Sequence, residues 1–89
     1  MPTVSFTSAL QRFMPVPTMQ VDAATVSNAL AAVFATHPTL RGYVLDDQGA
    51  LRRHVAVYVN GDLVRDRSHL ADPVHADDEI HVFQALTGG

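Results

Sequence analysis

Residues 52–65 read RRHVAVYVNGDLVR, and this stretch decides the fold class. Across 55–59, valine alternates with alanine and tyrosine, which is the period of two that a strand with one buried face requires. Asn60-Gly61 follows directly and is the strongest short signal for a tight hairpin turn. A strand over 55–59 and a short returning strand over 63–65 are therefore expected.

Two further strands are expected near the N-terminus, over 3–7 and 18–21, joined by a proline-containing connection over 10–17. One helix is expected after them. Thr25 is a suitable N-cap residue, and Pro38 stops the helix because a helix usually ends before the residue that precedes proline. Its apolar stripe has helical spacing and consists of Val26, Leu30, Val33, Phe34 and His37.

The remaining segments complete a small mixed sheet. Residues 40–53 have no regular period and carry a turn signal at 46–49, and 70–78 is a polar connection. The last strand is expected over 79–86, with Ile80 and Val82 on one face and His81, Phe83 and Ala85 on the other. This order predicts an α+β domain, a mixed sheet of four or five strands wrapped over one main helix. The expected organisation is one domain over 1–86 and a tail over 87–89.

Composition excludes several classes of function. Eighty-nine residues build one core, and a net charge of −3 with six arginines and no lysine offers no basic face to nucleic acid or anionic membranes. The absence of cysteine removes disulfides, a thiolate nucleophile and thiolate metal ligands. No signal-peptide pattern and no apolar run of membrane-spanning length is present, so we expect a cytoplasmic protein.

The pattern as a whole resembles the β-grasp, ubiquitin-like sulfur carriers of the MoaD/ThiS family, which include the molybdopterin synthase small subunit. The resemblance rests on residues 52–65, on TVSNALAAVFATHPTL over 25–40 and on LADPVHADDEIHVFQALTGG over 70–89. It is closest to the carriers that supply sulfur for cysteine or siderophore biosynthesis. One departure is Asp77, which stands where the family has a glycine in the turn before the last strand.

The resemblance implies a chemistry centred on the last two residues. An E1-like adenylyltransferase/sulfurtransferase of the MoeB/ThiF type would use ATP to adenylate the carboxylate of Gly89 and convert it to a thiocarboxylate. Gly88 and Gly89 lack a Cβ and would fit a narrow channel in that enzyme. The sulfur would then pass to a cysteine-synthase-like enzyme or to the molybdopterin synthase large subunit. The chain would act as a co-substrate without a bound cofactor, and ending at Gly89 it would need no proteolytic maturation.

A docking surface is expected beside this tail. In the family that this chain resembles, an aromatic residue at the position of Phe83 contacts the partners, so Phe83 is the first candidate anchor. Tyr58 and Ala85 are expected beside it on the outward face, although Tyr58 suits an ordinary sheet surface equally well. Leu86 and Thr87 would pack in the groove of the partner.

Three other functions remain open: the molybdopterin synthase small subunit, a protein modifier joined through Gly89 to lysines of other proteins, and a plain interaction domain. A metal site is not expected, because the six-residue spacing of the histidines fits neither helix nor strand. The acidic run at 77–79 matches a turn better than an acid–base site. The arginine-rich hairpin is either a solvated face or a surface that orients an acidic partner. The residues in question are His69, His75 and His81, and Arg52, Arg53, Arg65 and Arg67.

Overall fold

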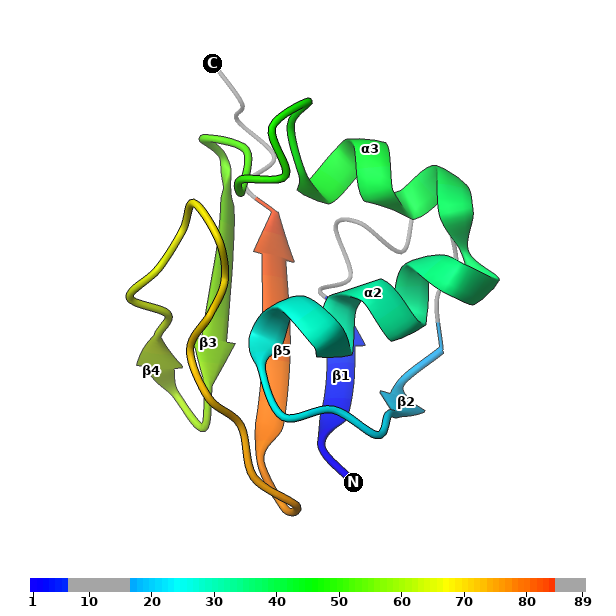
Figure 1. Cartoon of the computed structure of the whole chain (residues 1–89), viewed down its shortest axis with the longest axis vertical. Coiled ribbons are helices and arrows are strands. Elements are labelled where there is room, and N and C mark those ends of the chain that lie inside the picture. The colour runs from blue at the N-terminus through cyan, green and yellow to red at the C-terminus, as the bar shows by residue number, and fades with distance from the viewer. Residues whose placement is uncertain (7–16, 85–89) are drawn as a thin grey trace.

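A computed structural model of the chain describes residues 1–6 and 17–84. Its five-stranded sheet has the order β2-β1-β5-β3-β4, and the first and last strands lie side by side at its centre (Figure 1). β1 and β5 run parallel, whereas the other neighbours are antiparallel. The strands are β1 (Thr3–Phe6), β2 (Met19–Gln20), β3 (Val55–Val59), β4 (Asp62–Leu63) and β5 (Glu79–Gln84). The expected mixed sheet is confirmed, and the 10–17 connection lies almost wholly outside the described residues.

Helix α2 (Val26–Thr36) crosses one face of this sheet (Figure 1). The hydroxyl of Thr25 accepts a hydrogen bond of 3.1 Å from the amide of Asn28, which confirms the expected N-cap. The apolar stripe is buried, but His37 is wrongly included in it. His37 is the C-cap residue, is only half-buried, and donates its amide hydrogen to the carbonyl of Val33 at 3.0 Å. The helix ends at Thr36, before the residue that precedes Pro38, so His37 does not belong to the apolar face of the helix.

The segment over 40–53 is more regular than its sequence predicts. A 3₁₀ turn, η1 (Pro38–Leu40), leads into a second, short helix, α3 (Arg41–Val44). The one main helix is confirmed as α2, and the short α3 is an addition that the sequence did not predict. One helical turn is too short to show a period in the sequence, so only the fold reveals that its apolar side chains belong to the core. These buried side chains are Leu40, Val44, Leu45 and Leu51.

The β3–β4 hairpin has the tight turn that Asn60-Gly61 predicts. Both residues have a positive φ, 52° and 86°, as a two-residue type I′ turn requires. This turn pairs Tyr58 with Leu63, so β4 begins one residue earlier than expected and ends after Leu63. It does not continue to residue 65 because the carboxylate of Asp72 accepts the amide hydrogens of residues 65 and 66, both at 2.9 Å.

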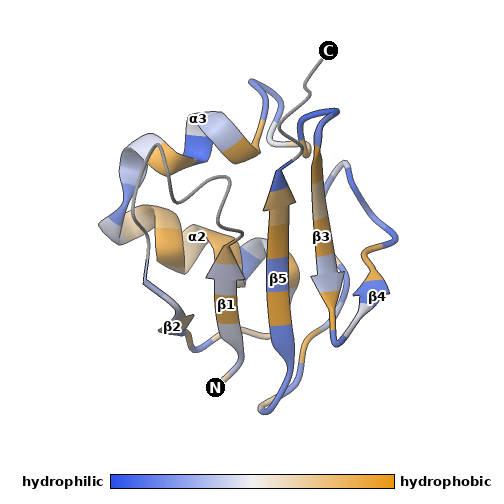
Figure 2. Cartoon of the chain, turned by 180° about the vertical axis from the view of Figure 1, so that it is seen from behind, coloured by the Kyte–Doolittle hydropathy of each residue, from blue (hydrophilic) through white to orange (hydrophobic). Residues whose placement is uncertain are grey.

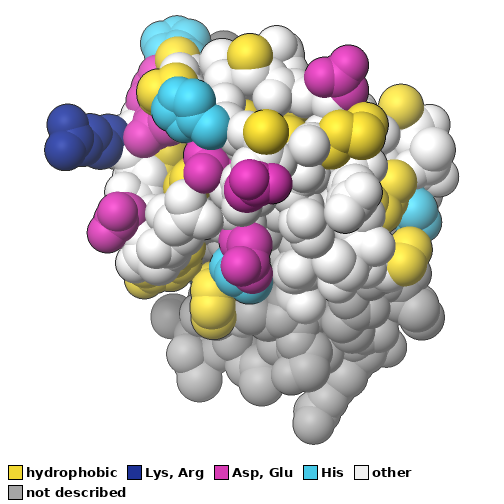
Figure 3. Space-filling model, turned by 90° about the horizontal axis from the view of Figure 1, so that it is seen from below, with side chains coloured by type: hydrophobic (Ala, Val, Ile, Leu, Met, Phe, Trp, Pro, Cys, Tyr) yellow, Lys and Arg dark blue, Asp and Glu magenta, His cyan; other side chains and the backbone are white. Residues whose placement is uncertain are grey.

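Asn60 also ties this hairpin to the start of β5. Its side-chain amide donates to the carboxylate of Asp78 at 2.8 Å, and its side-chain oxygen accepts from the amide of Glu79 at 2.8 Å. Figure 3, seen from below, shows acidic and histidine side chains gathered at this end of the molecule. Asp77 stands where the family has glycine, but it does not adopt the left-handed conformation that glycine would allow. Among the described residues other than glycine, only Asn60 and Leu70 have a positive φ.

The core fills the space between the sheet and the helices. Figure 2 shows the opposite face of the sheet without a covering helix, and along β5 apolar and polar residues alternate. Within the described part of the chain, no helix has the length and apolarity to cross a membrane. The fully buried side chains include Val4, Val26, Leu30, Val33, Leu40, Val57, Leu70, Ile80 and Val82.

Candidate functional site

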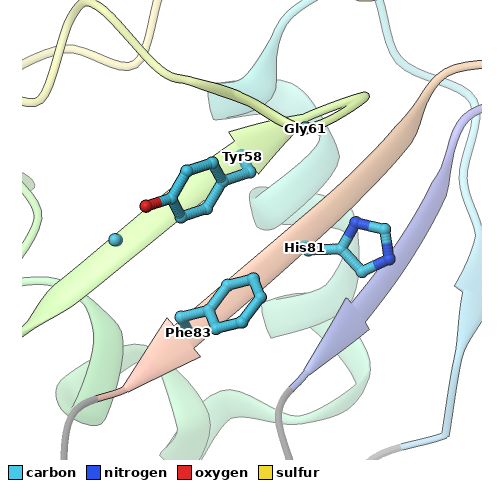
Figure 4. A pocket seen from close by; sticks show the side chains of 5 residues that line it. Tyr58, Gly61, His81 and Phe83 are labelled. Atoms are coloured by element: carbon cyan, nitrogen blue, oxygen red, sulfur yellow. The ribbon is translucent and has the colours of Figure 1, made fainter.

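The uncovered face of the sheet carries an aromatic pair. Tyr58 on β3 and Phe83 on β5 meet edge to face, with ring centroids 5.3 Å apart and an angle of 76° between the planes (Figure 4). Their neighbours Val57 and Val82 point to the core, at 0% and 1% exposure. The period of two along each strand therefore turns both aromatic rings toward solvent.

A shallow groove of about 500 Å³ runs along this aromatic pair. His81 forms one wall, with its ring centroid 6.5 Å from that of Phe83, and Gly61 of the hairpin turn closes one end (Figure 4). Phe83 is 46% exposed, although burial of a large apolar side chain away from water lowers the free energy. We call this surface the open-face groove; it is lined by Ala56, Tyr58, Gly61, His81 and Phe83.

Leu63 belongs to the same surface and was not expected there. It pairs with Tyr58 across β3 and β4, which places both side chains on the uncovered face, and it is 53% exposed. The sequence held a signal for this placement. A two-residue turn at Asn60-Gly61 forces residue 58 opposite residue 63, so the turn type alone predicts the facing pair.

The tail residues proposed from the sequence are Ala85, Leu86, Thr87, Gly88 and Gly89, and they lie outside the described residues. The structure describes where the tail is attached. β5 ends at Gln84, next to Phe83, so any protein that holds the tail also lies close to the open-face groove.

The histidines serve the connection between β4 and β5. The backbone amide of His75 donates to the carboxylate of Asp78 at 2.7 Å, and its ring nitrogen lies 3.6 Å from the same carboxylate. The backbone amide of His69 donates to Asp66 at 2.9 Å. Over residues 1–6 and 17–84, no three His, Cys, Asp or Glu side chains converge as metal ligands would.

Both carboxylates are stabilised in their charged form. Hydrogen bonds from backbone amides lower the pKa of Asp66, chiefly the bond from His69. The pKa of Asp78 is lowered mainly by the backbone amide of His75 and next by the side chain of Asn60. Asp66 therefore holds the loop after β4 in place, and Asp78 holds the turn before β5. A turn is what the sequence predicts for 77–79.

Two of the four hairpin arginines have structural partners. Arg52 donates from its Nε to the carbonyl of Gly42 at 2.7 Å, and Arg67 donates to the carbonyl of Arg52 at 2.8 Å. The first bond fastens α3 to the segment that enters β3, and the second fastens the connection after β4 to that same segment. This pair therefore has a structural role, and the interpretation of the four arginines as a solvated or partner-orienting face stays a prediction.

Central parallel strands, antiparallel edge hairpins and one long helix across the sheet define the ubiquitin-like β-grasp class. Comparison with known proteins agrees with this class. The ThiS family model matches residues 16–89, and the chain belongs to this family of ubiquitin-like sulfur carriers and small modifiers. The match includes Gly88 and Gly89.

Relatives with known sequences and structures support the assignment. Small archaeal modifier protein 1 of Haloferax volcanii is 36% identical over 75 residues, which cover 81% of this chain and 82% of that protein. Its crystal structure superposes with a TM-score of 0.82 at 31% identity, covering 99% of this chain and 98% of that one. The Amycolatopsis orientalis BexX/CysO complex contains a chain with a TM-score of 0.83 at 26% identity, and each chain is covered completely.

Proposed function

We propose that this chain is a sulfur carrier whose Gly89 carboxylate is adenylated and then converted to a thiocarboxylate. The observation that carries the proposal is the family match, which runs through β5 and the open-face groove to the terminal Gly88-Gly89. The chain contains no cysteine and therefore has no thiol of its own on which to carry sulfur. In this proposal the carboxylate of Gly89 is the group that carries the sulfur.

The proposed chemistry takes place in partner enzymes. A carboxylate oxygen of Gly89 attacks the α-phosphorus of ATP, pyrophosphate leaves, and an acyl-adenylate forms. A sulfide or persulfide sulfur then attacks the acyl carbon, the bond to AMP breaks, and AMP leaves with the bonding electrons. When the donor is a persulfide, a thiol must then cleave the sulfur–sulfur bond to release the thiocarboxylate. The chain contributes a small, unhindered acyl group, because neither glycine has a Cβ.

The open-face groove is the proposed docking site for the activating enzyme. Phe83 and Tyr58 are the anchors. Ala85, Leu86 and Thr87 are proposed to bind in a groove of the same enzyme that leads to its active site. Exposed aromatic side chains that gain burial on binding are typical energetic centres of interfaces. The activating enzyme is of the E1-like adenylyltransferase type, and the sulfur passes on to a cysteine-synthase-like enzyme or to the molybdopterin synthase large subunit.

Adenylation assays test this proposal. With the activating enzyme, ATP-dependent pyrophosphate release should require Gly89, so a variant that lacks Gly89 should be inactive. Phe83→Ala should lower kcat/KM about 10- to 100-fold, since truncation of a central aromatic anchor costs on the order of 2 kcal/mol or more. Tyr43→Ala is the matched control, because Tyr43 is 43% exposed on α3, away from the uncovered sheet face. Equal activity of the Gly89 deletion and the intact chain would refute the proposal.

A second candidate is a protein modifier, because a relative at 36% identity is a small archaeal modifier protein. In this function a lysine amine of a target attacks the activated Gly89 and an isopeptide bond forms as AMP leaves. The last arginine is Arg67 and lysine is absent, so trypsin would leave residues 68–89 attached to the target lysine. Mass spectrometry should search for that long remnant; a search for diglycine alone would miss it.

A further inference from the structure

The open-face groove differs in charge from one end to the other. Its apolar part is the aromatic pair, and Leu63, which pairs with Tyr58 on the same face and is 53% exposed, extends the apolar surface beside it. Its other end, at Gly61, is bordered by the hairpin turn and the turn that starts β5. Asn60 bonds to Asp78 and to the backbone of Glu79, so the two turns lie side by side. Figure 3 shows carboxylates gathered over this end, with Lys or Arg side chains only at its margin.

The two segments that line the groove supply carboxylates, and the ring of His75 lies 3.6 Å from one of them, that of Asp78. Residues 56–64 and 74–84 contain no arginine or lysine. Glu79 lies on the same face as His81, two residues earlier on β5, which is about 7 Å along the strand. Figure 1 places the N-terminal amine at this end too, and the negative charge remains in excess. We call this border the acidic end; it consists of Asp77, Asp78 and Glu79.

We propose that the protein docking on the open-face groove inserts an apolar side chain beside Tyr58, Leu63 and Phe83 and places arginine or lysine side chains against the acidic end. The inference rests on the proposed function, because it specifies the surface chemistry of the activating enzyme. Charge complementarity selects this occupant. A partner with carboxylates at that position would be repelled, and a wholly apolar one would leave Glu79 and Asp77 without counter-charges beside a desolvated groove.

This arrangement fixes the orientation of the complex. The cationic part of the partner lies at the end where β3 and β4 meet, and the tail leaves from the other end of β5, after Gln84. Long-range attraction to the acidic end then brings the partner to the groove with its active site on the side of the tail. Such steering acts on the association rate and weakens as salt screens the charges.

Association kinetics with the activating enzyme test the charged part. Glu79→Arg should lower the association rate constant about tenfold at low ionic strength, and the difference should shrink toward 1 M salt. Asp47→Arg is the control, since it changes the net charge equally in the 46–49 turn, at the end of the sheet where β3 begins. It should change the rate less than twofold. Asp77→Asn provides a milder second variant if Glu79→Arg is unstable.

Leu63→Ala tests the apolar part and should raise the dissociation rate about three- to tenfold. Equal rates for the Glu79 and Asp47 variants, or a rate independent of salt, would overturn the charged part, and an unchanged dissociation rate for Leu63→Ala would overturn the apolar part. These results differ from failure of the proposed function. In that case the unmodified chain itself would not be adenylated by the enzyme.

Discussion

Asn60 joins backbone conformation to tertiary structure through one side chain. It has a φ of 52°, and its amide group makes two bonds of 2.8 Å to the start of β5. Asparagine tolerates this left-handed conformation better than most residues. The residue therefore makes the hairpin turn and holds the acidic end of the open-face groove together.

Asn60→Ala should destabilise the protein by about 2–3 kcal/mol, because it loses two hydrogen bonds and strains the turn. Asn60→Gly should cost less, since glycine relieves the strain and only the side-chain bonds are lost. Urea unfolding of both variants gives the comparison. The account of the turn would be wrong if the glycine variant were the less stable of the two.

At the same scale, the sequence was sufficient to identify the aromatic pair but not the whole surface. The alternation over 55–59 and over 79–84 places Tyr58 and Phe83 on the uncovered face, as the structure confirms. Leu63 and His81 were not assigned to docking. Periodicity places His81 on the face of Phe83, but that His81 lies opposite Tyr58 follows only from the pairing of β3 with β5. The position of Leu63 follows from the type of the hairpin turn and not from strand periodicity.

Among the elements, α3 shows where sequence patterns fail. Its four residues give no measurable period, yet Leu40 before it is 0% exposed and Val44 within it is 1% exposed. Burial of this segment is decided by tertiary contacts, including the bond from Arg52 to the carbonyl of Gly42. Helix α2, in contrast, has a full apolar stripe and a cap, and both are visible in the sequence.

Two substitutions test whether α3 is a helix that closes the core. Leu40→Ala should cost about 2–5 kcal/mol, because it leaves a cavity in a fully buried site. Gly42→Ala should stabilise by about 0.5–1 kcal/mol, since a Cβ there meets no atom within 4 Å and alanine favours the helix. Thermal unfolding measures both. Destabilisation by Gly42→Ala would contradict the helical conformation.

The connection between β4 and β5 should make the fold sensitive to acid. The pKa values of Asp66 and Asp78 are lowered in the folded state, so each charged carboxylate stabilises the fold above its unfolded pKa of about 3.9. That stability is lost as the pH falls below about 4 and both groups take up protons. Unfolding temperatures between pH 7 and pH 3 should therefore drop steeply at the acid end.

Asp66→Asn combined with Asp78→Asn should flatten this drop and lower the stability at pH 7. Asp47→Asn is the control for the loss of a carboxylate, and its acid profile should follow that of the unmodified chain. An unchanged acid profile in the double variant would show that other groups cause the acid sensitivity.

At the scale of the whole molecule, the two faces of the sheet differ in what covers them. One face of the sheet is covered by α2 and the segment 38–51, and the other carries the open-face groove (Figures 1 and 2). The strand order and the class of fold could be predicted because long strands, one capped helix and a two-residue turn each leave a local pattern. The tail site was proposed from resemblance, since two glycines have no local pattern that distinguishes a reactive end from a linker.

The central claim is that the carboxylate of Gly89 becomes a thiocarboxylate. Intact-mass spectrometry tests it most directly, on the chain incubated with ATP, a sulfur donor and the activating enzyme. The predicted result is a mass increase that corresponds to one sulfur in place of one oxygen, located in the C-terminal fragment and absent from the Gly89 deletion. An unchanged mass under conditions in which ATP is consumed, or the same increase in the deletion variant, would contradict the account.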